Sequence, residues 1–142
     1  EEERKIIRSH TNSSPAHDVK PVVSIEELVE ARDIIKQIYL DEKIEKYILD
    51  LVFATRTPEL YQLKEIKSMI TYGASPRASI NMALAAKAHA FIQHRAYVTP
   101  DDVKAIAADI LRHRIGISFE AEAENISTDE IIKKILAIIQ VP

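Results

Sequence analysis

The sequence predicts an all-α fold, a bundle of about five helices with one short extended segment near residues 115–119. Ala, Ile, Leu, Glu and Lys dominate the composition, and these residue types favour helices. Glycine is rare, since Gly73 and Gly116 are the only two in 142 residues. Two capping boxes, each a Ser followed three residues later by a Glu, mark helix starts at Ser24 and Ser127.

Three helices are expected before residue 96. The first begins at Ser24, the second follows Asp41 and stops at Pro58, and the third runs from Pro76 to about residue 95. Apolar residues recur at helical spacing in each, so one face of each helix should enter a common core. The expected core positions are Ile25, Leu28, Val29, Ile35 and Ile38 in the first helix, Ile44, Ile48, Leu51 and Val52 in the second, and Ile80, Leu84, Ala88, Phe91 and Ile92 in the third.

Two further helices follow. Thr99-Pro-Asp-Asp102 combines a capping Thr, a proline at the first helical position and acids in the first turn, and it predicts a helix to about residue 113. The last helix opens at Ser127. Residues 59–72 could hold a short helix or an irregular loop. Residues 115–123 alternate apolar and polar, which indicates an extended piece, although 119–124 could equally form a turn of helix.

The chain is expected to comprise three parts. Residues 1–8 read as the tail of a helix that belongs to an upstream core, because no capping residue precedes them. Residues 9–23 contain Ser, Thr, Asn, His and two prolines, a composition typical of a linker. Residues 24–142 form the helical domain.

Composition excludes several classes of function. The absence of cysteine excludes a disulfide framework and a thiolate metal site. The apolar runs are too short for a membrane span, and no secretory pattern is present, so we expect a cytoplasmic protein. A net charge of −3 gives no general attraction for nucleic acid. A Walker A loop needs two nearby glycines followed by a Lys, and Gly73 and Gly116 are too far apart to supply one.

The strongest candidate for a functional site is Gly73-Ala-Ser-Pro-Arg-Ala78. Ser75 suits the helix N-cap, and Pro76 then occupies the first helical position, where its missing N–H costs nothing. Arg77 falls in the first turn, where a cation opposes the partial positive charge of the helix end. A bound phosphate would remove this conflict, because free backbone amides and a guanidinium would converge on it. The alternative is a surface arginine whose charge is screened by water.

The surrounding sequence favours the anion. Residues 66–100 contain no Asp or Glu, and their four basic residues, Lys67, Arg77, Lys87 and Arg95, give a formal charge of +4. Such a segment can concentrate anions locally in a protein that is acidic overall. Part of the depletion of acids has a simpler cause, because the Ala-rich helix after Pro76 should be mostly buried.

No metal site is predicted. His89 and His94 are five residues apart and so fall on different faces of a helix. Glu120, Glu122 and Glu124 could line one face of a strand and attract a cation, but a solvated acidic edge is the favoured interpretation. Arg112-His-Arg114 at the end of the fourth helix should complement the helix dipole, with contact to a neighbour or a phosphate as the alternative.

Four motifs in order give the chain a resemblance to the C-terminal part of MoxR-type AAA+ ATPases. They are Gly73-Ala-Ser-Pro-Arg-Ala78, then Ala85-Ala-Lys-Ala88 with Tyr97-Val-Thr-Pro-Asp-Asp-Val103, then Leu111-Arg-His-Arg-Ile115, and finally Glu120-Ala-Glu-Ala-Glu124 with Ile126-Ser127 and the terminal Ile-rich helix. They span most of residues 24–142, and residues 1–8 resemble the last helix of the preceding core. Each motif alone is weak, whereas the ordered set is specific.

The resemblance implies an α-helical lid that closes over a nucleotide held by an α/β core. It makes Arg77 the sensor-2 residue, which reaches the γ-phosphate and stabilises charge as that phosphate leaves. Gly73, Ser75 and Pro76 are the other expected nucleotide-binding positions. The resemblance also implies ATP and Mg²⁺ in the full-length protein, a homo-oligomeric ring expected to be a hexamer, and chaperone-like remodelling or activation of partners, some with von Willebrand factor A domains.

The Walker motifs, sensor 1 and the arginine finger belong to the core in that family, so this chain alone should not hydrolyse ATP. Two alternatives stay open. One is the lid of a magnesium-chelatase-type subunit, which shares the Ser-Pro-Arg element. The other is a free-standing helical binding module that docks nucleic acid through residues 66–100. The few aromatic residues and the negative net charge argue against it, so no nucleic-acid partner is expected.

Overall fold

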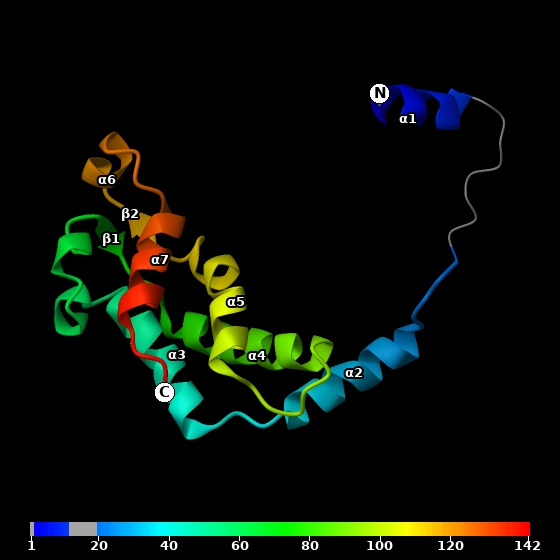
Figure 1. Ribbon diagram of the computed structural model, residues 1–142, viewed down its shortest axis with the longest axis horizontal. Coiled ribbons are helices and arrows are strands. Elements are labelled where there is room, and N and C mark those ends of the chain that lie inside the picture. Colours follow the sequence, from blue (N-terminus) through cyan, green and yellow to red (C-terminus); the bar gives the residue numbers. More distant parts are fainter. Residues whose placement is uncertain (1, 12–19) are drawn as a thin grey trace. The chain divides into compact units, whose positions relative to one another are not determined.

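The computed structural model describes residues 2–11 and 20–142. The chain divides into two compact units, residues 1–31 and 32–142. The first unit contains helix α1 (Glu2–Thr11) and the greater part of α2 (Ile25–Gln37) (Figure 1). Helix α1 therefore extends three residues beyond the expected tail at 1–8. Most of the expected linker, residues 12–19, lies outside the described residues.

Helix α2 starts as predicted but does not bury the predicted face. Ser24 and Glu27 form the capping box, with the Glu27 amide 3.1 Å from the Ser24 Oγ and the Ser24 amide 2.7 Å from the Glu27 Oε2. No residue of α2 is buried. Ile25, Leu28 and Val29 are at least 53% exposed. Capping depends on four consecutive residues, whereas burial depends on residues that are distant in the sequence. Ile38, directly after α2, is 5% exposed, as predicted.

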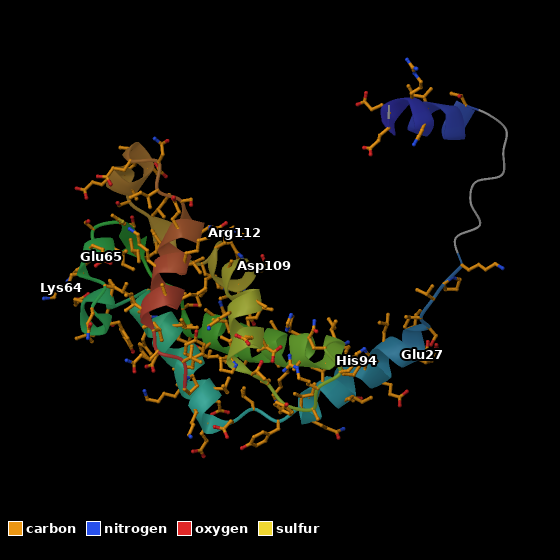
Figure 2. The ribbon with its side chains drawn as sticks, in the orientation of Figure 1. Glu27, Lys64, Glu65, His94, Asp109 and Arg112 are labelled. Carbon is orange, nitrogen blue, oxygen red and sulfur yellow. The ribbon has the colours of Figure 1, made fainter. Side chains whose placement is uncertain are left out.

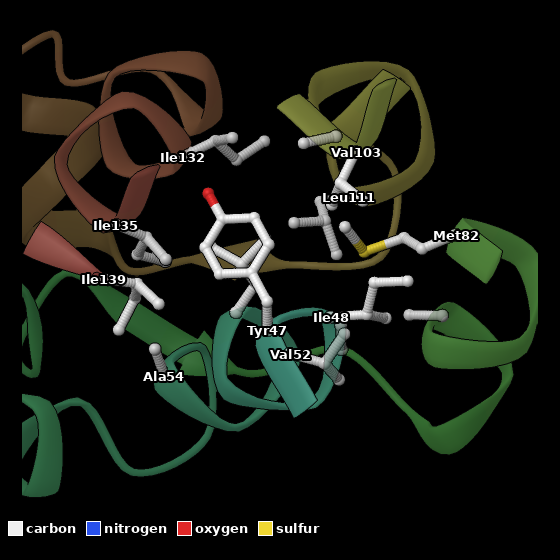
Figure 3. Close-up of a cluster of buried hydrophobic side chains, with 14 of the residues drawn as sticks. Tyr47, Ile48, Val52, Ala54, Met82, Val103, Leu111, Ile132, Ile135 and Ile139 are labelled. Carbon is white, nitrogen blue, oxygen red and sulfur yellow. The ribbon is translucent and has the colours of Figure 1, made fainter. Parts of the chain in front are cut away.

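The second unit is built on four helices around one hydrophobic core. They are α3 (Glu42–Ala54), α4 (Pro76–Ile92), α5 (Pro100–Leu111) and α7 (Thr128–Ile138). Helix α4 packs most extensively against α5, and α7 packs against α5 and α3 (Figure 1). Figure 3 shows side chains from all four helices meeting in this core. The largest fully buried side chains include Tyr47, Ile48, Leu51, Met82, Leu111, Ile131, Ile132 and Ile135. The expected helical bundle is confirmed.

Helix α4 buries a face of small residues. Ala78, Met82, Ala86 and Ala90 recur every fourth residue and are fully buried. The prediction that Ile80, Leu84 and Ile92 face the core is wrong, because these side chains are at least 53% exposed. Phe91, which was expected with them, is partly buried against the core. Ala side chains let two helix backbones approach closely, which accounts for the extensive contact with α5. The core positions expected in the second helix are buried as predicted.

Short elements connect the helices. Two 3₁₀ helices, Pro58–Tyr61 and Lys64–Ile66, precede strand β1 (Ile70–Tyr72), and β1 pairs antiparallel with β2 (Gly116–Ile117). Tyr72 lies opposite Gly116, and its exposed ring packs over the glycine, where a Cβ would come within 2.2 Å and the ring would have to shift.

Helix α6 (Phe119–Ala123) follows β2, which confirms both the extended piece and the turn of helix that the sequence left open. Glu120, Glu122 and Glu124 are exposed on α6 and just after it. The idea that these acids line a strand is therefore wrong. Ala and Glu favour helix, and Ser118 caps this one by accepting a hydrogen bond from the Ala121 amide at 3.2 Å.

Within the described residues, every helix is too short or too polar to cross a lipid bilayer.

Leu51 provides a test of the core. We expect Leu51→Ala to lower the free energy of unfolding by about 2–5 kcal/mol, because Leu51 is fully buried and the smaller side chain leaves a cavity. The matched control is Leu60→Ala, since Leu60 is 76% exposed, and its effect should stay within about 0.5 kcal/mol. Urea unfolding of the chain measures both, and equal effects would contradict the described core.

Candidate functional site

The start of helix α4 is built as the sequence predicts, with one difference. Ser75 is the N-cap residue with extended backbone (φ −76°, ψ 169°), and Pro76 is the first helical residue. The Ser75 hydroxyl makes no capping hydrogen bond, although its carbonyl accepts one from the Ala78 amide at 2.8 Å. The first turn of α4 therefore has no side-chain cap of its own.

Arg77 is exposed at this helix start. The first turn of α4 contains no acidic residue. Among the described residues, no hydrogen-bond or ion-pair partner of its guanidinium is found. The neighbouring Ala78 is fully buried and anchors this turn in the core. The structure thus presents an unneutralised cation beside the positive end of a helix dipole.

The other three cations of the acid-free segment are occupied. Lys67 forms an ion pair with Glu59 at 2.9 Å, and the Lys87 Nζ donates to the Lys36 carbonyl at 3.1 Å. Arg95 binds the buried Asp102 at 2.5 Å. Within the part of the chain that the structure describes, Arg77 is the cation of residues 66–100 for which no hydrogen-bond or ion-pair partner is found, whereas Lys87 binds a neutral carbonyl. This isolation is the main argument for a site at Arg77.

The backbone before Ser75 is tied to the end of helix α3. Thr55 is 1% exposed, and its hydroxyl donates to the Val52 carbonyl at 2.6 Å and accepts from the Ala74 amide at 2.9 Å. The Arg56 Nε donates to the Ala74 carbonyl at 2.5 Å. Two consecutive residues thus bind both backbone polar groups of Ala74. Sequence reasoning missed these contacts, because 18 and 19 residues separate the partners.

The presence of glycine at position 73 has a structural explanation that involves no ligand. A Cβ at this position would lie 2.4 Å from the Thr55 carbonyl oxygen, so the two backbone segments are too close for any side chain. Its φ is not positive, so glycine is needed here for space. The expected contact of Gly73 with nucleotide stays a prediction, as do those of Ser75 and Pro76.

A buried carboxylate joins the other end of α4 to α5. Asp102 is fully buried and accepts from Arg95 at 2.5 and 2.6 Å, from the His89 Nδ1 at 2.7 Å and from the Thr99 amide at 2.7 Å. Burial alone would raise the pKa of Asp102, but the hydrogen bonds from Arg95, Thr99 and His89 outweigh it and hold that pKa far below its ordinary value. The sequence placed Asp102 in a first turn but gave no sign of its burial.

The remaining candidates have structural roles. Arg112 binds Asp129 at 2.8 Å and Asp109 at 3.3 Å, and Figure 2 labels Asp109 and Arg112 near the end of α5. Arg114 donates to the Ile110 carbonyl at 2.5 Å, as expected for a cation at a helix C-terminus. His94, labelled in Figure 2, is exposed and lies beyond the end of α4. His89, by contrast, is hydrogen-bonded to Asp102. The described residues contain no group of three or more potential metal ligands.

Comparison with known families covers this region. Residues 63–135, about half of the chain, match the AAA lid domain family. The chain belongs to the AAA lid domain family. The matched residues include the whole start of α4 and the Asp102 cluster.

Similarity to individual proteins identifies the type of AAA+ protein to which this lid belongs. The chain is 34% identical to the chaperone MoxR1 of Mycobacterium tuberculosis over 142 residues, which cover 100% of the chain and 37% of that protein. It is 34% identical to the MoxR protein of Paracoccus denitrificans over 79 residues, or 53% of the chain and 23% of that protein. The expected resemblance is confirmed, and the lid is of the MoxR type of AAA+ ATPases.

A solved structure gives the same result. This chain matches the crystal structure of a protein from Cytophaga hutchinsonii with a TM-score of 0.90 and 45% sequence identity. That protein is provisionally described as an ATPase. The match covers 99% of this chain and 42% of that one. The chain thus spans less than half of the length of the relatives and the structure that it matches.

The Asp102 cluster provides a stability test of the lid. We expect Asp102→Asn to lower the free energy of unfolding by about 1.5–3 kcal/mol, because the amide loses charge-assisted hydrogen bonds to Arg95 and His89. Asp109→Asn is the matched control on the same helix, since the Asp109 side chain is 75% exposed and its pair with Arg112 should contribute little. Urea unfolding at neutral pH measures both, and equal losses would contradict this assignment.

The difference between wild type and Asp102→Asn should also depend on pH. The pKa of Asp102 is lower in the folded than in the unfolded chain, so its contribution is complete above the unfolded value of about 3.9. It is lost as the pH falls from there toward the folded pKa. A stability difference that stays constant down to about pH 2 would show that the carboxylate charge is not the cause.

Proposed function

We propose that the full-length protein hydrolyses ATP and that Arg77 is its sensor-2 residue, the lid arginine that contacts the γ-phosphate. The observation that carries this proposal is the isolation of Arg77, an exposed cation in an acid-free first turn, whereas Lys67, Lys87 and Arg95 are all engaged. The MoxR type of the lid supports the same role.

The chemistry of the helix start suits a phosphate. Arg77 brings N–H donors in a planar fork, and the first backbone amides of α4 carry the positive end of the dipole. An anion placed there would satisfy both and would relieve their mutual repulsion. When the γ-phosphoryl group leaves, charge builds on its oxygens, and an arginine that contacts them can raise the rate by about 10³-fold or more.

The remaining parts of the reaction are assigned to the core of the full-length protein. The described residues offer no cluster for a metal ion, so we expect the core to hold Mg²⁺, which neutralises charge on the β- and γ-phosphates when bound. Ser75, Pro76 and Gly73 would shape the backbone that faces the nucleotide. The Ser75 hydroxyl is available for such a contact, since it makes no capping bond.

The assembly and its clients are also part of the proposal. AAA+ proteins of the MoxR family generally form oligomers, and we propose a homo-oligomeric ring, with a hexamer as the expected size. We propose chaperone-like remodelling or activation of partner proteins in the cytoplasm, including partners with von Willebrand factor A domains. The relative named chaperone MoxR1 supports the chaperone-like role.

Arg77→Ala in the full-length protein tests the proposal. We expect most ATP turnover to be lost while the fold and much of the nucleotide affinity are kept, because the contact acts mainly on the departing phosphate. Arg77→Lys should restore only part of the rate, since Lys keeps the charge but lacks the planar fork. Steady-state ATPase kinetics and nucleotide titration measure the two effects.

Arg32→Ala is the control for the loss of an exposed arginine, and it should leave turnover within about twofold of wild type. Full activity of Arg77→Ala would refute the sensor-2 assignment. A large rise in KM with unchanged kcat would contradict the transition-state role, since it would mean that Arg77 only helps to bind the nucleotide.

The 142-residue chain alone should bind ATP very weakly. A single charge-assisted phosphate contact contributes about 1.5–3 kcal/mol, whereas even a 1 mM affinity requires about 4 kcal/mol. Isothermal titration of the chain with ATP should therefore give no measurable saturation below about 1 mM. Tight binding would mean that the chain holds a nucleotide site independent of the core.

A further inference from the structure

We infer that Thr55 and Arg56 are positioning residues for Arg77. They hold the backbone of Ala74 against the end of helix α3 and so fix where helix α4 begins. The inference rests on the proposed function of Arg77, and it assigns Thr55 and Arg56 a role through the backbone of Ala74.

The Thr55 hydroxyl binds two backbone groups at once. It donates to the Val52 carbonyl at 2.6 Å, in the last turn of α3, and accepts from the Ala74 amide at 2.9 Å. Thr55 is 1% exposed and Ala74 is fully buried, so water cannot replace this hydrogen bond. The position of Ala74 is thereby set by the end of α3.

Arg56 binds the other polar group of the same residue. Its Nε donates to the Ala74 carbonyl at 2.5 Å, and its Cζ lies 5.1 Å from the centroid of the Phe53 ring. The ring restricts the guanidinium on one face, and the carbonyl of Ala74 fixes it in the plane. With Thr55, Arg56 holds Ala74 by both its N–H and its C=O.

Gly73 shows how little the segment can shift. A Cβ there would lie 2.4 Å from the Thr55 carbonyl oxygen and 2.9 Å from the Arg56 Cα. The chain from Gly73 to Ala74 therefore lies in direct backbone contact with Thr55 and Arg56. Only Ser75 and Pro76 separate Ala74 from Arg77, and the ring of Pro76 fixes its own φ. A displacement of Ala74 must therefore pass to Arg77.

The way α4 starts explains why such an anchor is needed. The N-cap side chains of α3, α6 and α7 accept a hydrogen bond from their own first turns. The Ser75 side chain does not cap α4. The start of α4 is thus held from outside, through Ala74. Among the described residues, this arrangement leaves the Ser75 hydroxyl without a capping bond and the Arg77 guanidinium without a partner, while the backbone before them is held in place.

Thr55→Val in the full-length protein is the first test. Val keeps the volume of Thr but removes the hydroxyl, so the Ala74 amide loses its partner. We expect kcat for ATP hydrolysis to fall roughly 10- to 100-fold, because small misplacements of a catalytic group have effects of this size. The KM for ATP should change by less than about threefold, and Thr55→Ser should restore most of kcat.

Thr57→Val is the matched control. Thr57 lies two residues further on and also donates from its hydroxyl to a backbone carbonyl, that of Phe53 at 3.3 Å, but it is not bound to Ala74. Its kcat should stay within about twofold of wild type. Arg56→Met is the second variant, which keeps most of the aliphatic stem and removes the Nε donor, and its kcat should fall in the same way. It decides the inference if Thr55→Val does not fold.

The double variant Thr55→Val/Arg77→Ala separates this inference from the proposed function. If Thr55 acts through Arg77, the double variant should be no slower than Arg77→Ala alone, since the two effects are not additive. Multiplied losses would overturn the inference, because Thr55 would then act elsewhere. Normal kcat in Thr55→Val or Arg56→Met, with a loss in Arg77→Ala, would overturn the inference alone. Full activity in Arg77→Ala would instead refute the proposed function.

Discussion

The site depends on the attachment of Ala74 to the end of helix α3. Thr55 and Arg56 bind the two backbone groups of Ala74, and Gly73 allows the close approach that these hydrogen bonds need. Because the Ser75 side chain makes no capping hydrogen bond to α4, this attachment fixes the position of Pro76 and Arg77. The helix start combines a fixed backbone with an unneutralised charge, and this combination is suited to meeting an anion.

The sequence predicted the features that depend on neighbouring residues. Capping signals gave the starts of α2, α5 and α7, since each signal involves residues three apart. The sequence did not predict which helix faces are buried, because burial depends on the surfaces of other helices. In α4 the larger residues Ile80, Leu84 and Ile92 were expected inside, yet the face with Ala86 and Ala90 is buried, because it allows close contact with α5. In the first predicted helix, Leu28 and Val29 were expected inside and are exposed, whereas Ile38 is buried as expected.

The candidate site shows the same division. Arg77 could be singled out from the sequence because a cation in a first turn contradicts the helix dipole. Its isolation could not be predicted, because it depends on the partners of the other three cations in the folded chain. These partners are Glu59 for Lys67, the Lys36 carbonyl for Lys87 and Asp102 for Arg95. The contacts of Ala74 could not be predicted either, because Thr55 and Arg56 lie at the end of another helix, 19 and 18 residues away in the sequence.

Helix α4 is fastened at both of its ends. Thr55 and Arg56 tie its beginning to α3, while His89 and Arg95 tie its far end to Asp102 at the start of α5. Its 17 residues form a rod about 25 Å long. Such a rod cannot slide along its axis without breaking charged hydrogen bonds in the interior. A force on Arg77 is therefore expected to move α3, α4 and α5 together as one rigid body.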